Sequence, residues 1–225
     1  MSKDWTKIRA KVKDFIESEI YPKETELAKG TPEAREMLGS LMQLAKDEKI
    51  WALGHPEDIG GGGMPFMEYV YVNEVIGRSS FAMVALGTHS LQDSIMLREF
   101  ASPHWRDQYL EPLVQGEIFP SFGMTEPDVA SSDPTQLQTT AILDNGTWKI
   151  NGTKWFTTGA ARAAYTTVMC RTELDAPSHG AFSMIIVPTD NPGYKIVRET
   201  PVLGINGGHY EVKYDNVEVP EENLL

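Results

Sequence analysis

The hydrophobic pattern of the chain changes near Glu117, and this change constrains the fold more than any other feature. Before it, apolar residues recur at helical spacing. After it, short segments rich in Thr, Val, Ile and aromatic residues alternate with turn signals such as Asn145-Gly146. Helices followed by strands predict an α+β fold, with an all-α helical domain over residues 1–117 and a small antiparallel β-barrel or sandwich domain over residues 118–225.

Several amphipathic segments make up the first half. The first places its apolar residues on one helical face, namely Trp5, Ile8, Val12, Phe15 and Ile16. Pro22 is expected to end that helix, because proline lacks the backbone N–H that the helix needs. Thr31 and Pro32 form an N-cap and first-turn pair that predicts the start of a second helix. Further helices are expected over residues 65–77, 81–101 and 102–116.

Strand-like segments fill the second half. They are short, carry β-branched and aromatic residues, and end at Gly, Asn or Pro. The predicted strands span residues 138–144, 148–152, 154–159, 165–172, 182–188, 194–199 and 210–220.

Charge and cysteine content exclude several classes of protein. The net charge of −12 argues against binding to nucleic acid or to an anionic membrane, since both need clustered Lys and Arg. No window approaches the roughly 18 apolar residues of a membrane span. Cys170 is the one cysteine, so it forms no disulfide within the chain and is expected to serve packing. Together these features predict a soluble, cytoplasmic protein.

Common catalytic and metal-binding motifs are missing. The glycines at 60–63 lack the Gly-Lys-Ser/Thr of a phosphate loop, so a turn between helices is the better interpretation. The five histidines are scattered without zinc-site spacing, and no metal site is predicted. No sequence resembles the G-x-S-x-G turn of a serine hydrolase.

The stretch "FGMTEPDVASSD", from Phe122 to Asp133, lies where the two halves meet. Its Pro, Asp and Ser residues are ones that bend or cap backbone. Composition alone therefore favours a helix-to-sheet connector, although the same hydroxyl and amide groups could also bind a ligand.

A second stretch, "NGTKWFTTGA" from Asn151 to Ala160, supports the ligand-binding interpretation. Together the two stretches resemble the flavin site of the acyl-CoA dehydrogenase family, where a Thr-Glu-Pro loop precedes an Asn-Gly-x-Lys strand. "GGGGMPFMEYVYVNEVIGR", "HWRDQYLEPLVQGE" and "GGHYEVKYDNVEVPEENLL" extend the likeness along the chain. The chain resembles only the N-terminal and middle domains of the family, and a C-terminal helical domain would follow Leu225.

The resemblance implies that FAD binds against the β domain. The residues that it places at FAD are Phe122, Met124, Thr125, Ser131, Ser132, Phe156, Thr157 and Thr158. Among these, Ser131 and Ser132 would face the pyrophosphate or the substrate's pantetheine, with Ser132 also binding substrate, and Thr157 would contribute backbone. Two residues depart from the family pattern, since Ser131 replaces a glycine and Phe156 replaces a tryptophan.

The family chemistry implies dehydrogenation of the α,β bond of an acyl-CoA thioester in lipid metabolism, with hydride transfer to FAD. An electron-transfer flavoprotein would accept the electrons, and the full-length enzyme would be a homo-oligomer. No catalytic residue is predicted in this chain, because the family's base lies in the C-terminal domain and Glu126 is expected to be structural. The chain alone is expected to bind FAD weakly and to be inactive.

Two alternatives remain open at the level of sequence. Relatives of the same superfamily are flavin-dependent monooxygenases or oxidases, and no residue here separates them from dehydrogenases. The chain could also be a non-catalytic truncated or split subunit that binds a ligand or a complementary chain.

Overall fold

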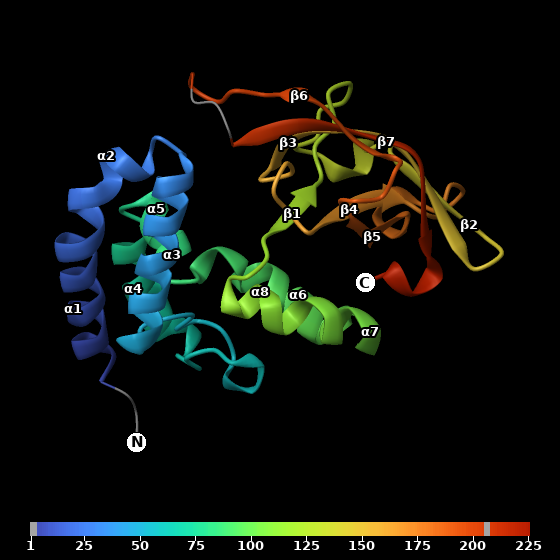
Figure 1. The fold of residues 1–225 in the computed structure, drawn as a ribbon. Helices are drawn as coiled ribbons and strands as arrows, with labels where there is room; N and C mark the ends of the chain where they lie inside the picture. Colours follow the sequence, from blue (N-terminus) through green and yellow to red (C-terminus); the bar gives the residue numbers. More distant parts are fainter. Residues whose placement is uncertain (1–3, 205–207) are drawn as a thin grey trace. The chain divides into compact units, whose positions relative to one another are not determined.

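A computed structural model describes residues 4–204 and 208–225 (Figure 1). The chain divides into two compact units. One holds Met1–Ile95 and Leu110–Gly116, and the other holds Met96–Tyr109 and Glu117–Leu225. The helical stretch from Met96 to Tyr109 therefore belongs to the unit that contains the strands.

The predicted helices of the first half are present, with some breaks. Within the described residues the α-helices are α1 (Trp5–Phe15), α2 (Glu24–Leu27), α3 (Pro32–Asp47), α4 (Phe66–Ile76), α5 (Ser80–Ala85), α6 (Leu91–Phe100), α7 (Pro103–Trp105) and α8 (Glu111–Gln115). Thr31 caps α3 as predicted, because its hydroxyl accepts a hydrogen bond from the Ala34 N–H at 3.3 Å.

Pro22 distorts the first helix rather than ending the helical path. A π-helical turn, Ile16–Ile20, and a 3₁₀ turn, Tyr21–Lys23, carry the chain from α1 into α2. Proline removes one backbone donor, and the changed hydrogen-bond spacing on either side absorbs that loss. The expectation that Pro22 stops the helical segment was therefore wrong.

The single helix expected over residues 81–101 is broken at Gly87. This glycine has φ 69°, and a Cβ there would lie 2.7 Å from the Trp51 ring. A left-handed residue cannot continue an α-helix, so α5 ends and α6 begins after a short 3₁₀ turn, Thr88–Ser90.

The core of the first unit follows the predicted apolar faces. Trp5 and Ile8 are only partly buried, but the rest of the first stripe is buried. His55 also belongs to this core, where its Nε2 lies 3.1 Å from the Ser90 hydroxyl and burial lowers its pKa to about 4. The principal buried side chains are Val12, Ile16, Ile20, Leu41, Ala45, Val72, Val75 and Ile76.

The second unit contains one strongly curled sheet (Figure 1). Its described strands run in the order β1-β4-β2-β3-β7-β6, with β5 paired to β4. They are β1 (Pro120–Gly123), β2 (Thr140–Asp144), β3 (Thr147–Thr158), β4 (Tyr165–Arg171), β5 (Phe182–Pro188), β6 (Tyr194–Glu199) and β7 (His209–Pro220). The predicted α+β class is confirmed.

The sheet is mixed rather than purely antiparallel. β1, which the sequence pattern did not predict, runs parallel to β4, and β2 pairs with β4 in parallel at Thr140 and Arg171. The two strands expected at 148–152 and 154–159 are one strand, β3, interrupted by register shifts near Gly152 and between Lys154 and Thr157. Such irregularities bend a long strand and help a sheet to curl.

Within residues 4–204 and 208–225, no helix has both the length and the apolar character needed to cross a membrane.

Candidate functional site

The loop of residues 124–139 leaves the sheet at one edge of β4. β5 occupies the other edge of that strand along its whole length. β1 follows β4 as far as Gly123, opposite Val168, and β2 joins β4 at Thr140, opposite Arg171. Because β1 and β2 use successive positions of one edge, the chain between them must arch out of the sheet.

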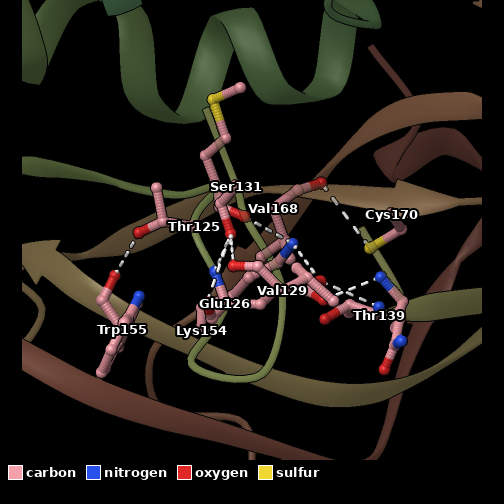
Figure 2. Close-up of polar contacts among 11 residues, drawn as sticks. Thr125, Glu126, Val129, Ser131, Thr139, Lys154, Trp155, Val168 and Cys170 are labelled. Atoms are coloured by element: carbon pink, nitrogen blue, oxygen red, sulfur yellow. Dashed lines mark hydrogen bonds and ion pairs between the residues drawn. The ribbon is translucent and has the colours of Figure 1, made fainter. Parts of the chain in front are cut away.

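The predicted loop and strand motifs lie side by side. β3 pairs with β2 only as far as Asn151. Beyond that residue, the same edge of β3 forms hydrogen bonds to the loop. The Trp155 N–H donates to the Thr125 carbonyl at 2.9 Å, and the Thr125 hydroxyl donates to the Trp155 carbonyl, also at 2.9 Å (Figure 2). The Ser121 hydroxyl donates to the Thr158 carbonyl at 2.7 Å. These bonds fix β1 and the start of the loop against β3.

A buried ion pair lies beneath this contact. Lys154 Nζ is 2.8 Å from Glu126 Oε1 and donates to the Met124 carbonyl at 2.8 Å (Figure 2). The Glu126 carboxylate also accepts from the backbone N–H groups of Gln138, at 2.7 Å, and Thr139, at 2.9 Å. The side chains of Lys154 and Glu126 are 0% and 5% exposed. One carboxylate therefore holds both ends of the loop, a structural role.

Burial and hydrogen bonding oppose each other at Glu126. Burial by itself raises the pKa of the carboxyl, but the bonds from Lys154, Thr139 and Gln138 together outweigh it and hold the pKa below its ordinary value. Burial also lowers the pKa of Lys154, and the Glu126 charge partly opposes that change. The pair is thus kept ionised by its own contacts.

Cys170 lies in the core of the same sheet and is fully buried. Burial raises the pKa of its thiol to about 12, so almost no thiolate exists at neutral pH. We expect the native protein not to react with a thiol reagent such as DTNB at pH 8, and to titrate one thiol per chain in urea. Rapid reaction of the native protein would contradict this burial.

Ser131 uses its hydroxyl inside the loop. The hydroxyl accepts from the Glu126 N–H at 2.8 Å and lies within donating distance of the Glu126 and Val129 carbonyls, at 3.2 and 3.3 Å (Figure 2). Asp133 accepts from the Thr135 N–H at 3.1 Å. Ser132, between these turns, is exposed. Of the two serines, Ser132 is thus exposed, while Ser131 is partly buried and bonded within the loop.

Phe156 lies in the second register shift of β3, with its backbone in the left-handed region at φ 48°. A bulky residue rarely adopts this conformation, and backbone strain of this kind concentrates at functional sites. The ring is 41% exposed and stands 4.8 Å from the Trp155 ring, measured between centroids. An aromatic surface is therefore held outward at a cost in backbone energy.

The residues after Phe156 alternate in exposure. Thr157 is fully buried, and its hydroxyl has no hydrogen-bond partner within residues 4–204 and 208–225. Thr158 is exposed, and its hydroxyl lies 3.0 Å from His209 Nδ1. Because alternate side chains of a strand share a face, Phe156 and Thr158 point outward while Thr157 points inward.

The remaining predicted residues are partly buried at the start of the loop. Phe122 is in β1 opposite Thr167, and Met124 follows it, with its carbonyl bound by Lys154. The structure therefore joins Met124 and Thr125 to the bulge of β3. Ser132 lies on the far arm of the loop.

Sequence reasoning did not identify Lys154, Ser121 or His209 as parts of this arrangement. Lys154 carried two signals, namely its place in the Asn-Gly-x-Lys motif and its position inside a strand of apolar and Thr residues, since a lysine is rarely buried without a partner. Ser121 and His209 carry no local signal, since their partners lie 37 and 51 positions away in the sequence.

Sequence comparisons cover both halves of the chain. The family model described as "Acyl-CoA dehydrogenase, N-terminal domain" matches residues 2–117, and the one described as "Acyl-CoA dehydrogenase, middle domain" matches residues 121–217. A protein of Mycobacterium tuberculosis named "Probable acyl-CoA dehydrogenase FadE2" is 38% identical over 96% of the chain. The match spans 56% of that protein's length.

Solved structures show the same fold. A protein of Mycobacterium abscessus that is named for the acyl-CoA dehydrogenases aligns over the whole chain with a TM-score of 0.91 and 32% identity, across 60% of its own length. A glutaryl-CoA dehydrogenase of Mycobacterium smegmatis, solved in complex with FADH2, aligns with a TM-score of 0.77 over the whole chain and 55% of its own. At 24% identity the latter shows the fold alone.

Proposed function

The chain belongs to the acyl-CoA dehydrogenase family of oxidoreductases, and from this we propose that the protein carrying it oxidises the α,β bond of an acyl-CoA thioester with FAD. The chain spans 56% of the M. tuberculosis relative, so the activity is proposed for the whole protein. The observation that carries the proposal is the joining of the Thr125 loop to the β3 bulge, with Phe156 and Thr158 held outward.

The exposed groups fit the isoalloxazine ring. FAD, when bound, supplies the hydride acceptor. Phe156 offers an aromatic face that can stack on a flat ring and exclude water. Thr158 offers an exposed hydroxyl, and Ser132 offers another for phosphate or the substrate's pantetheine. The strain at Phe156 gives an independent sign that its position serves a ligand.

The hydrogen bonds refine which groups are available. The Thr125 hydroxyl proton is committed to the Trp155 carbonyl, so its oxygen can act toward FAD only as an acceptor. Ser131 is occupied within the loop, so in this proposal its part is to shape the backbone. Phe122 and Met124 add partly buried apolar surface beside these groups.

Glu126 is a poor base for removing the substrate's α-proton. Its carboxylate is buried, bound to Lys154 and two backbone N–H groups, and has a lowered pKa. A general base must reach its proton and needs a pKa near the working pH. We therefore expect residues 1–225 by themselves not to reduce a dye with acyl-CoA. Weak binding of FAD by these residues alone remains an expectation from the family resemblance.

The proposal is tested on purified protein at full natural length. We expect bound FAD, bleached by an acyl-CoA under anaerobic conditions and reoxidised by an electron-carrier flavoprotein. Protein that stays colourless in excess FAD would overturn the proposal. Rapid oxygen consumption with acyl-CoA would instead favour the oxidase or monooxygenase alternative.

Phe156→Gly separates strain from ligand binding. Glycine adopts φ 48° without the left-handed penalty of about 1–2 kcal/mol that Phe156 bears. The relief of this penalty offsets the entropic cost of glycine in a strand, which is about 0.5–1 kcal/mol. We expect the free energy of unfolding to stay within about 1 kcal/mol of wild type, while FAD affinity falls about tenfold. Urea denaturation and FAD titration measure the two quantities.

Leu203→Gly is the matched control, since Leu203 has φ 51° and is 96% exposed. It should not change FAD affinity. If Phe156→Gly leaves FAD affinity equally unchanged, the Phe156 ring does not contact the cofactor.

A further inference from the structure

Thr158 and His209 face each other across two paired strands. They are register partners in the β3–β7 ladder, and Thr158 Oγ1 lies 3.0 Å from His209 Nδ1. The backbone on both sides is fixed, because the Ser121 hydroxyl holds the Thr158 carbonyl and the Gly159 N–H donates to the Gly208 carbonyl at 2.9 Å. The backbone of both residues is thus held in place, while the Thr158 O–H bond can still rotate to point its hydrogen in different directions.

The state of the imidazole decides that direction. A neutral ring with its proton on Nε2 has an acceptor at Nδ1, so the Thr158 hydroxyl donates to His209 and offers only lone pairs to a third group. A ring that carries a proton on Nδ1 donates to Thr158, and the hydroxyl hydrogen then becomes free to donate outward.

We propose that His209 is a positioning residue that sets whether Thr158 presents a hydrogen-bond donor or an acceptor to its ligand. The proposal rests on the proposed function, in which that ligand is the flavin ring. A donating hydroxyl matches the bare ring nitrogen of oxidised flavin, and an accepting hydroxyl matches the ring N–H of the reduced form. A His209 ring with a proton on Nδ1 thus favours oxidised FAD, and a neutral ring with its proton on Nε2 favours the reduced form.

The charged groups near His209 come from three elements. Glu211, on the same strand, forms an ion pair with Arg198 of β6 at 2.7 Å. Glu199 of β6 is opposite Tyr210, the neighbour of His209, and Arg162 follows β3 with its guanidinium over the Phe119 ring. The β3 residues beside Thr158 carry no charge.

The first test needs no flavin. Nitrogen NMR of the chain labelled at histidine reads the tautomer of each ring, and His209→Gln assigns the His209 signal. At pH 8 we expect His209 to hold its proton on Nε2, and we expect Thr158→Val to shift the Nδ1 signal and mix the tautomers. Thr153→Val, in the same strand, should leave the signal unchanged. Identical His209 spectra in wild type and Thr158→Val would overturn the proposal.

The second test measures the affinity for oxidised FAD between pH 5.5 and 8. We expect binding to be about three- to tenfold tighter with a proton on Nδ1 of His209 than without one, since one hydrogen bond is gained. His209→Gln, which cannot titrate, should lose this dependence, while His179→Gln should keep it. An unchanged profile in His209→Gln overturns the proposal. If wild type binds no FAD at any pH, the proposed function is wrong, and so is the role of Thr158 toward flavin. The flavin-free spectra would still decide whether His209 controls the direction of the Thr158 hydroxyl.

Discussion

Replacing Lys154 with Met is expected to lower the free energy of unfolding by about 3–5 kcal/mol, because it leaves a buried carboxylate without its cation. Glu126 would keep the backbone N–H groups of Gln138 and Thr139 but lose its charge partner, and the Met124 carbonyl would lose a donor. Urea denaturation followed by circular dichroism measures the change.

A surface variant and a double variant distinguish the loss of the buried ion pair in Lys154→Met from the loss of a positive charge in general. Lys195 pairs with Asp215 at 2.6 Å, but both side chains are exposed, so Lys195→Met should cost about 1 kcal/mol or less. Glu126→Gln combined with Lys154→Met should cost less than the sum of the single variants, since each single change strands the other partner. Equal losses for Lys154→Met and Lys195→Met would show that the buried pair is not a special contact.

The Glu126–Lys154 pair also makes the free energy of unfolding depend on pH in the acidic range. Glu126 has a lower pKa folded than its ordinary value of 4.5, so the unfolded chain binds more protons in the interval between the two values. The contribution to stability is fully present above pH 4.5 and is lost as the pH falls through the folded pKa. Lys154→Met removes one cause of the shift and should weaken this acid dependence.

Much of the fold could be predicted because its signals are local. The buried stripe of the first helix and the Thr31 cap need only neighbouring residues to form. The helix break at Gly87 and the strand β1 were not predicted, for different reasons. The break at Gly87 depends on Trp51, which is far away in sequence, and β1 has only four residues, too few to show an alternating pattern.

The candidate site was predictable only through the likeness of its two motifs to a family. Nothing local indicates that Trp155 bonds to Thr125, or that Glu126 meets Lys154 across 28 positions. These contacts depend on β1 and β2 sharing an edge of β4, which is a property of the assembled sheet. The strained backbone at Phe156 likewise arises from the pairing of β3 with β7.

Replacing Gly152 with Ala is expected to lower the free energy of unfolding by about 3 kcal/mol or more, from strain and overpacking together. Gly152 has φ 154°, and a Cβ there would lie 2.3 Å from Thr139 Oγ1 and 2.8 Å from Thr139 Cα. Because backbone is among the atoms met, a rotamer change cannot relieve the contact. Denaturation in urea measures the loss.

Gly146→Ala isolates the steric part of that loss. Gly146 also has a positive φ, 78°, but a Cβ there meets nothing within 4 Å, so its cost should be only about 1–2 kcal/mol. The displaced Thr139 supplies one of the N–H groups that hold Glu126, so its amide should exchange hydrogen faster in Gly152→Ala alone. Equal losses for the two variants, with unchanged exchange at Thr139, would mean that the base of the loop tolerates a side chain at 152 and that the Glu126 contacts do not depend on this close approach.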